Sequence, residues 1–214
     1  MITAIVLTLP AINTTQLRQR LREQRRHLSA IEQQRHANRI TGRIVHARFF
    51  KHAKHIALYL PSDGEVDLTP LILRLFNQFN SGNKQCFLPV IVSKRDALMR
   101  FAPYTPGTKM RKNCFSIDEP VYRRRELKSA AHMDLILAPL VGFDSEGNRM
   151  GMGGGYYDRA LQHLRHQSEK GRSIIKPRFV GIAHAIQKVD KLQHQTWDIP
   201  LHAIITEQEL RYFQ

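Results

Sequence analysis

Residues 147–159, with the sequence GNRMGMGGGYYDR, hold five glycines in nine positions, followed by two tyrosines and an Asp-Arg pair. Glycine adopts positive φ readily and lets a ligand approach the backbone closely. Successive backbone N–H groups in such a loop can converge on an anion, and the N-terminus of a following helix adds its dipole. Arg149 can clamp a phosphate oxygen with its fork of donors, and Asp158 can ligate a magnesium ion that bridges phosphates. The stretch therefore predicts a phosphate-binding loop.

Two well-known phosphate loops do not match this stretch. It lacks the Gly-Lys-Ser/Thr ending of a P-loop, and Tyr156 stands where the third glycine of G-x-G-x-x-G would lie. A glycine cluster alone is more often a tight or mobile surface loop, in which Asp158 would only stabilise a helix dipole. The predicted strand before the loop, the flanking arginine and the acidic-aromatic exit favour phosphate binding.

Short apolar runs that alternate with helical spacing predict the elements that would position this loop. Strands are expected at 55–60, 85–92, 98–102, 134–141, 179–183 and 203–206, and helices at 68–79 and 156–166. Apolar strands alternating with helices predict an α/β fold, a mostly parallel sheet flanked by helices (Rossmann-like, three-layer), in a single domain over 1–214. Ligands bind at the carboxyl ends of such strands. The segments after Leu60, Val141 and Ala183 should therefore share one rim, with His184 near it as a supporting group.

Residues 15–51 are predicted to form basic N-terminal helices packed on this domain. Leucines keep helical spacing in the first part, while arginines crowd the remaining faces, namely Arg18, Arg22, Arg25 and Arg26. The segment from Ser29 to Glu32 is a capping box, which predicts that a second helix begins there.

The formal net charge of +15 indicates an anionic partner: nucleic acid, anionic lipid, or a phosphorylated or polycarboxylate small molecule. No apolar run approaches the length needed to cross a bilayer. The two cysteines lack metal-type spacing, which favours a reducing cytoplasm over a disulfide scaffold. The eleven histidines form no H-x-x-x-H or H-E-x-x-H array of a transition-metal site.

Taken with two other segments, the glycine loop resembles the 5-formyltetrahydrofolate cyclo-ligase family, over nearly the whole chain beyond about residue 15. The family carries Gly-x-Arg-Leu-Gly-x-Gly-Gly-Gly-Tyr-Tyr-Asp-Arg, and Met150 takes the leucine position here. Residues 59–71 (YLPSDGEVDLTPL) resemble the family's substrate-side loop. Residues 181–184, Gln187, 197–200 and 204–207 complete the pattern.

The resemblance implies an ATP-dependent ligase. In the family, ATP phosphorylates the formyl oxygen of 5-formyltetrahydrofolate, N10 attacks the activated carbon, and loss of phosphate leaves 5,10-methenyltetrahydrofolate and ADP. The implied cofactors are ATP and Mg²⁺. The implied partner is the small-molecule folate, free or polyglutamylated, with no nucleic acid and no membrane, and the implied protein is a cytoplasmic monomer.

The resemblance also implies roles for individual residues. Arg149 and Tyr157 are expected in catalysis, and Asp158 and Asp198 at the magnesium ion. The ATP contacts expected are Arg18, Arg149, Met150, Gly151, Met152, Gly153, Gly154, Gly155, Tyr156 and Tyr157. The folate contacts expected are Ser62, Glu65, Asp67, Met152, Gly153, Gly154, Gly155 and Tyr156. Whether Glu65 or Asp67 faces the pterin depends on register and stays open.

Two positions depart from the family pattern. Thr14 stands where the family usually has a lysine, and Gly154 stands where some members carry a basic residue.

Two alternative functions remain open. The first alternative is a basic nucleic-acid-binding protein using the arginines of 18–26 and 123–125, although no helix-turn-helix, RNP-like or zinc pattern accompanies them. The second is a sugar-phosphate or CoA-handling enzyme on the same fold.

Overall fold

The computed structural model describes residues 13–77, 84–164 and 177–213, and their central feature is a seven-stranded sheet with the order β11-β10-β9-β6-β1-β2-β3. The inner strands β10, β9, β6, β1 and β2 run parallel, whereas the edge strands β3 and β11 are antiparallel to their neighbours. The strands are β1 (His55–Ala57), β2 (Gln85–Ser93), β3 (Leu98–Tyr104), β6 (Leu135–Pro139), β9 (Arg178–Ile182), β10 (Ala203–Ile205) and β11 (Leu210–Tyr212).

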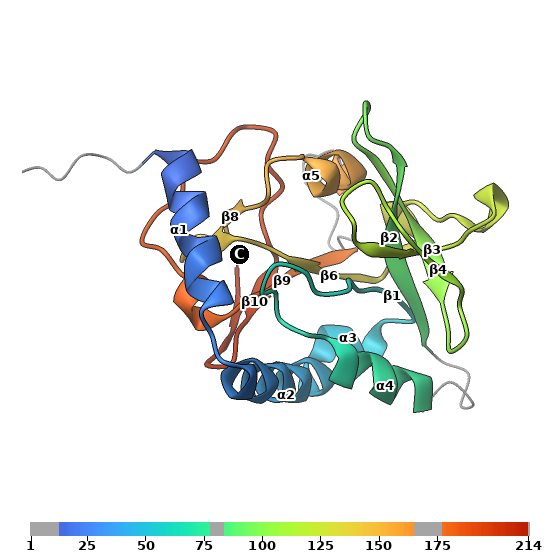
Figure 1. Ribbon diagram of the computed structural model, residues 1–214, viewed down its shortest axis with the longest axis horizontal. Helices are drawn as coiled ribbons and strands as arrows, with labels where there is room; N and C mark the ends of the chain where they lie inside the picture. Colours follow the sequence, from blue (N-terminus) through green and yellow to red (C-terminus); the bar gives the residue numbers. More distant parts are fainter. Residues whose placement is uncertain (1–12, 78–83, 165–176, 214) are drawn as a thin grey trace, which may run out of the picture.

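Helices cover the two faces of the sheet unequally. Figure 1 shows α2 (Ala30–His46), α3 (Arg48–His52) and α4 (Thr69–Asn77) together beneath the sheet, and α5 (Tyr156–Leu161) above it. The first helix, α1 (Thr14–Arg26), stands at one end of the layers, next to β8 (Figure 1). Two small hairpins and three 3-10 turns complete the described elements: β4 (Met110–Lys112) with β5 (Asp118–Pro120), β7 (Gly142–Phe143) with β8 (Arg149–Met150), η2 (Arg124–Glu126), η3 (Ala130–His132) and η4 (Ala185–Gln187).

The central strand β6 is buried on both faces. Leu135 and Leu137 pack into the cluster under α2 and α4, whereas Ile136 and Ala138 pack into the cluster on the side of α5. Alternate residues of a strand point to opposite faces, so a strand covered on both sides must be apolar at every position. The continuous apolar run of this segment therefore follows from its place in the middle of the sheet.

Capping boxes set the starts of the first two helices. Ser29 accepts a hydrogen bond from the Glu32 amide at 3.3 Å, and the Glu32 carboxylate accepts one from the Ser29 amide at 2.9 Å. Asn13 and Gln16 form the same reciprocal pair at the start of α1. The box at Ser29 confirms the helix start predicted there, because it satisfies backbone donors that have no partner inside the helix.

All six predicted strands are present, but the structure differs from the sequence prediction in its other elements in two respects. The antiparallel edge strand β11 and the hairpins β4–β5 and β7–β8 were not predicted, since their short segments carry no strong alternation. The helix predicted at 156–166 corresponds to α5, which ends at Leu161. Positions 165–166 of that predicted helix, and positions 78–79 of the helix predicted at 68–79, lie outside the described residues. The α/β class and the mostly parallel sheet are confirmed.

Gly181 in β9 offers a test of core packing. A Cβ there would lie 2.7 Å from Cδ1 of Ile204 and 2.8 Å from methyl groups of Leu140 and Leu201, so we expect Gly181→Ala to destabilise the fold by about 1–3 kcal/mol through overpacking. A Cβ added to Gly42 in α2 would meet nothing within 4 Å, so Gly42→Ala should stabilise by about 0.5–1 kcal/mol. Urea unfolding of both variants measures the two effects, and a Gly181→Ala protein as stable as the parent would contradict the packing argument.

Candidate active site

Three chain segments meet at one rim of the sheet, as the sequence predicted. The strands β1, β6 and β9 are parallel neighbours, so the segments that follow them leave the sheet at the same edge. After β6, the carbonyl of Leu140 accepts hydrogen bonds from Arg25 Nη1 at 2.9 Å and from Gln187 Nε2 at 2.7 Å. The end of β6 is thereby tied to helix α1 and to the segment after β9.

Arg25 is the side chain that joins α1 to this rim. Its side chain is 1% exposed, and its Nε donates to the Asp63 carbonyl at 2.8 Å while Nη2 donates to the Asp63 carboxylate at 2.9 Å. Asp63 has a φ of 50°, a left-handed conformation that aspartate tolerates better than most residues. Arg22 donates to the same carboxylate at 2.7 Å, and Arg26 lies 3.4 Å from it. Three arginines of one basic helix therefore bind one acidic loop residue.

The same face of α1 presents Arg18 to the glycine loop. Positions 18, 22 and 25 are spaced by four and three residues, so their side chains line one side of the helix. Arg18 Nε donates to the Gly151 carbonyl at 3.0 Å. Thr14, the first residue of α1, lies one turn before Arg18 on this side, at the position where the family usually carries lysine.

The glycine loop, residues 151–155 between β8 and α5, has three of its five carbonyls bound by the protein, whereas its amides have no partner among the described residues. The carbonyl of Gly151 accepts from Arg18, that of Gly154 from Arg159 Nη1 at 3.2 Å, and that of Gly155 from the Arg159 amide at 3.1 Å. Among the described residues, no protein group accepts a hydrogen bond from the amides of 151–155. Gly153 and Gly155 have φ values of 96° and 66°, the conformation that glycine makes accessible. The loop therefore offers several N–H donors to an anion.

Side chains around the loop leave little room for a residue larger than glycine at 154. A Cβ on Gly154 would lie 2.8 Å from Cε2 of Tyr156, so the basic residue that some family members carry would require this ring to move. Met152 is 54% exposed, whereas Met150 is buried against Leu21 and Leu192. Met150 therefore contributes packing, and of the two methionines expected at the ligand only Met152 presents its side chain to solvent.

Arg149 and Asp158 form an ion pair beneath the loop. Arg149 Nη2 pairs with Asp158 Oδ1, which also accepts a hydrogen bond from the Ile199 amide at 3.1 Å. The guanidinium carbon of Arg149 lies 5.0 Å from the ring centroid of Phe179, and its side chain is 9% exposed. The sequence placed this arginine at the mouth of the loop. The structure holds it inward instead, because a carboxylate and an aromatic face both attract the guanidinium.

The two aspartates expected at magnesium come from segments that touch. The amide of Ile199, the residue after Asp198, donates to Asp158, and Asp198 Oδ2 accepts from the Gln195 amide at 2.8 Å. Within the described part of the chain, Asp158 Oδ2 and Asp198 Oδ1 have no hydrogen-bond partner. Mg²⁺ binds through one or two carboxylates together with phosphate oxygens and water, so this donor set fits the ion.

Neither tyrosine after the loop has the environment of a base. Tyr157 stacks on Phe179 with ring centroids 5.8 Å apart, and burial together with the negative charge of Glu65 raises the pKa of its hydroxyl above the ordinary value. Tyr156 meets Phe115 edge-on, with centroids 6.0 Å apart. The phenol of Tyr157 therefore stays protonated and can act only as a hydrogen-bond donor or acceptor.

The loop after β1 separates the two candidate pterin carboxylates. Glu65 is nearly buried and accepts hydrogen bonds from Ser62, from the amide at 3.0 Å and from Oγ at 3.3 Å. Its other oxygen lies 3.7 Å from Arg25 Nη2, and burial raises the pKa of Glu65 despite this positive charge. Asp67 instead accepts from the Thr69 amide at 2.8 Å, at the start of α4. Glu65 thus lies at the rim with Arg25, whereas Asp67 caps a helix.

Comparisons with known proteins bear on this arrangement. The model of the 5-formyltetrahydrofolate cyclo-ligase family matches residues 12–207. The chain belongs to this family. The 5-formyltetrahydrofolate cyclo-ligase of Haemophilus influenzae is 36% identical over 190 residues, covering 89% of this chain and 95% of that protein. The cyclo-ligase of Escherichia coli K12 is 35% identical over 186 residues, covering 87% and 96%.

Solved structures of cyclo-ligase relatives share the fold. The 5,10-methenyltetrahydrofolate synthetase of Aquifex aeolicus superposes with a TM-score of 0.76 at 31% identity, over 94% of this chain and 92% of that one. The synthetase of Mycoplasma pneumoniae gives 0.66 at 25% identity, over 90% and 98%. Together with the family match, these results confirm the resemblance read from the sequence. Among the described residues, no helix combines the length and hydropathy that a membrane span requires.

The ion pairs of Asp63 predict how the stability of this cyclo-ligase depends on pH. Burial alone would raise the pKa of Asp63, but the hydrogen bonds from Arg22 and Arg25 lower it overall. A carboxyl whose pKa is lower in the folded state stabilises the fold above its unfolded pKa of about 3.9, and this stability is lost as the pH falls through the folded pKa. We therefore expect Asp63→Asn to be less stable than the parent at pH 7 and to lose less stability between pH 5 and pH 3.

Urea unfolding at several pH values measures this difference. Asparagine also tolerates the left-handed conformation at position 63, so the substitution changes charge with little backbone strain. Asp96→Asn is the matched control, because Asp96 is exposed and, among the described residues, bonds only to its sequence neighbours Arg95 and Ser93. Parallel pH profiles for Asp63→Asn and the parent would show that the arginine cluster does not hold the rim.

Proposed function

We propose that this protein uses ATP and Mg²⁺ to convert 5-formyltetrahydrofolate to 5,10-methenyltetrahydrofolate, with ADP and phosphate as the other products. The observation that carries the proposal is the glycine loop: Arg18 and Arg159 bind three of its carbonyls, while no described residue accepts a hydrogen bond from its amides. Phosphoryl transfer needs positioning and neutralisation of charge more than covalent help from the protein. Free amides on a loop that is already fixed supply that positioning without rearrangement.

The phosphates of the nucleotide would bind along residues 149–157. Amides of Gly151, Met152, Gly153, Gly154 and Gly155 would donate to phosphate oxygens. Arg18 would add positive charge from above, since its Nη groups have no partner among the described residues. Bound ATP supplies the phosphoryl group that activates the formyl oxygen. The residues of the chain hold and orient the phosphates while the negative charge shifts between oxygens.

Asp158 and Asp198 would hold the magnesium ion, which would neutralise part of the charge of the phosphates. Arg149 neutralises Asp158 in the structure as it stands, so a cation on Asp158 would take over that neutralisation. Arg149 would then be available to the phosphates that lie directly after it in the loop.

The folate would bind beside the loop, with Glu65 on the edge of its pterin ring. The edge of a reduced pterin carries adjacent N–H donors, and a carboxylate accepts such donors in a bidentate manner. Glu65 is held by Ser62 and Arg25 at the rim, whereas Asp67 is committed to the start of α4, so we assign the pterin to Glu65. Met152, which is exposed, and Tyr156 would contact the folate from the loop, and Tyr157 would contribute its neutral hydroxyl or its ring.

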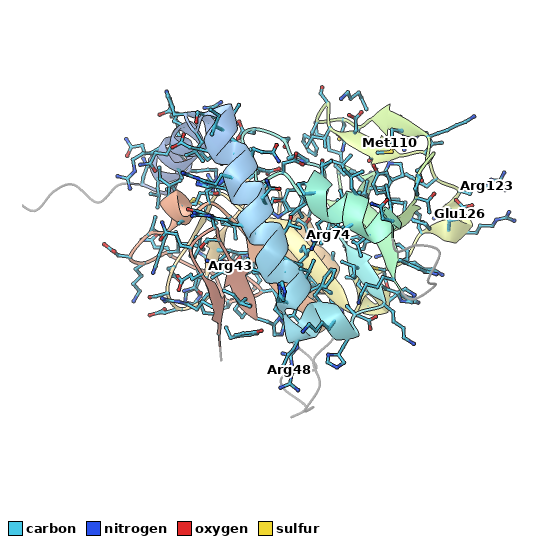
Figure 2. All side chains as sticks on the ribbon, turned by 90° about the horizontal axis from the view of Figure 1, so that it is seen from below. Arg43, Arg48, Arg74, Met110, Arg123 and Glu126 are labelled. Atoms are coloured by element: carbon cyan, nitrogen blue, oxygen red, sulfur yellow. The ribbon has the colours of Figure 1, made fainter. Side chains whose placement is uncertain are left out.

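The basic character of the chain is compatible with this ligand rather than with nucleic acid. Asp63 forms ion pairs with three arginines of helix α1, namely Arg22, Arg25 and Arg26, so this helix is not a free cationic surface. Figure 2 shows Arg43, Arg48 and Arg74 on the helical side of the molecule, and Arg43 binds backbone carbonyls of residues 206–208. The arginines that remain exposed would attract a polyanionic ligand such as a polyglutamylated folate.

A turnover assay tests the proposal directly. Purified protein with ATP, Mg²⁺ and 5-formyltetrahydrofolate should form a product with the near-ultraviolet absorption of the methenyl compound. Omission of ATP or addition of a magnesium chelator should abolish the signal. Absence of turnover together with tight, salt-sensitive binding of RNA would favour the nucleic-acid alternative instead.

A pair of glycine variants tests the loop separately. Gly153 and Gly107 have φ values of 96° and 85°, and a Cβ added to either would meet no atom within 4 Å, so alanine should cost each about 1–3 kcal/mol of backbone strain. Only Gly153 lies in the proposed phosphate loop. We expect Gly153→Ala to raise the KM for ATP by about tenfold or more, equivalent to about 1.4 kcal/mol, while Gly107→Ala leaves it unchanged. Equal ATP kinetics for the two variants would remove the loop from the nucleotide site.

A further inference from the structure

Three buried side chains from distant parts of the sequence converge on one point. They are His36 of α2, His184 directly before η4, and Glu207 after β10, and one ligand atom from each lies within 4.8 Å of the other two. Nδ1 of His36 lies 2.9 Å from Nδ1 of His184 and 3.9 Å from Oε2 of Glu207. His184 is fully buried, and the other two side chains are 10% exposed or less. The cluster joins the layer of helices to the segments after two parallel strands.

The carboxylate of Glu207 has less compensation than other buried acids of this chain. Within the described residues its only close donor is the Ala185 amide, at 2.9 Å from Oε2, and no arginine or lysine pairs with it. Asp144, which is also buried, accepts four hydrogen bonds from nitrogen donors, and the buried Glu119 pairs with Arg111 at 2.8 Å. A buried carboxylate without such partners requires a compensating positive charge.

The basic groups near the cluster do not supply that charge to the carboxylate. Arg43 donates to the backbone carbonyls of Thr206, Glu207 and Gln208, so its guanidinium binds the chain next to the carboxylate and not the carboxylate itself. Arg25 acts on His184 as a neighbouring positive charge, but its own donors are directed at Asp63 and Leu140. The positive charge that compensates the Glu207 carboxylate must therefore come from one of the two histidines or from a cation bound by all three side chains.

His184 is fully buried, and its ring is held in one orientation. Its amide donates to Gln187 Oε1 at 2.8 Å, and its second ring nitrogen, Nε2, is buried beside the backbone of Gly64 without a hydrogen bond of good geometry. The ring is therefore fixed with Nδ1 directed at His36.

We propose that His36, His184 and Glu207 form a binding site for a divalent transition-metal ion, with Zn²⁺ the best match to the ligands. Two imidazole nitrogens and one carboxylate oxygen suit zinc, with water as a fourth ligand, whereas Mg²⁺ prefers oxygen ligands alone. In a tetrahedral site with Zn–N bonds of 2.0–2.1 Å, two nitrogens lie about 3.3 Å apart. The observed 2.9 Å means that the rings need to separate by only a few tenths of an ångström.

The proposed role of this ion is structural. It would tie α2 to the segments after β9 and β10, and His184 also touches the Gly64 backbone in the rim loop that carries Asp63 and Glu65. A metal that binds only the folded chain stabilises it in proportion to the logarithm of the free metal concentration over its Kd. The site is separate from Asp158 and Asp198 and takes a different class of ion.

Metal titration of the chelator-treated full-length protein tests this inference without any use of turnover. Co²⁺ serves as the spectroscopic probe, and millimolar Mg²⁺ is present to compete for any site made of oxygen ligands alone. We expect one equivalent of Co²⁺ to give visible d–d absorption, Zn²⁺ to displace it, and Zn²⁺ to raise the melting temperature. His36→Gln and Glu207→Gln should each weaken this binding at least tenfold, whereas His46→Gln, an exposed histidine of the same helix, should bind like the parent.

Two results would overturn the inference. The first is a parent protein that binds no stoichiometric Co²⁺ or Zn²⁺. The second is binding that His36→Gln and His46→Gln reduce equally, which would indicate surface histidines and leave the cluster as a hydrogen-bonded histidine pair. Should either cluster variant fail to fold by circular dichroism, X-ray absorption of the zinc-loaded parent decides, because only a shell of two imidazoles and oxygen supports the site. A sulfur ligand would point to the exposed Cys114 instead.

Discussion

The buried guanidinium of Arg25 is the contact on which the arrangement of the site depends. An isolated buried charge costs several kcal/mol, and Arg25 avoids that cost only where Asp63 and the Leu140 carbonyl are both within reach. Asp63 belongs to the loop after β1 and Leu140 to the end of β6, while Arg25 itself lies on α1. The helix, the rim loop and the strand end are therefore placed by one side chain, and a shift of any of them would leave a buried charge without its partner.

Placement of α1 in turn determines the state of the glycine loop. Arg18 lies two turns before Arg25 on the same side of the helix, so fixing the helix directs Arg18 at the Gly151 carbonyl. Arg159 holds the carbonyls of Gly154 and Gly155 from the other side. Among the described residues, hydrogen bonds to this loop are thus made only at its acceptors. Its amide donors are left without a protein partner, as a preorganised anion site requires.

The sequence predicted those features that local patterns encode. Apolar runs gave the strands, a capping box gave the start of α2, and the general rule for parallel sheets placed three segments on one rim. It did not predict that Arg25 is buried, since an arginine among arginines looks like part of a solvated face. Nor did it pair His36 with His184, because 148 positions separate them and metal motifs are recognised by short spacings. Contacts between residues so distant in the sequence can be predicted only when the order of the strands in the sheet is known.

Asp158 and Glu207 are two carboxylates of this chain with different neighbours. Asp158 is paired with Arg149, which also rests on Phe179, so in the proposed site Mg²⁺ alone would have to displace an arginine that is already well placed. Phosphate changes this balance, because it offers Arg149 a second anion while adding oxygen ligands for the metal. Magnesium and nucleotide should therefore bind cooperatively at the rim. Glu207 has no such resident arginine or lysine among the described residues, so an ion there would displace no cationic side chain and could stay bound whether or not nucleotide is present.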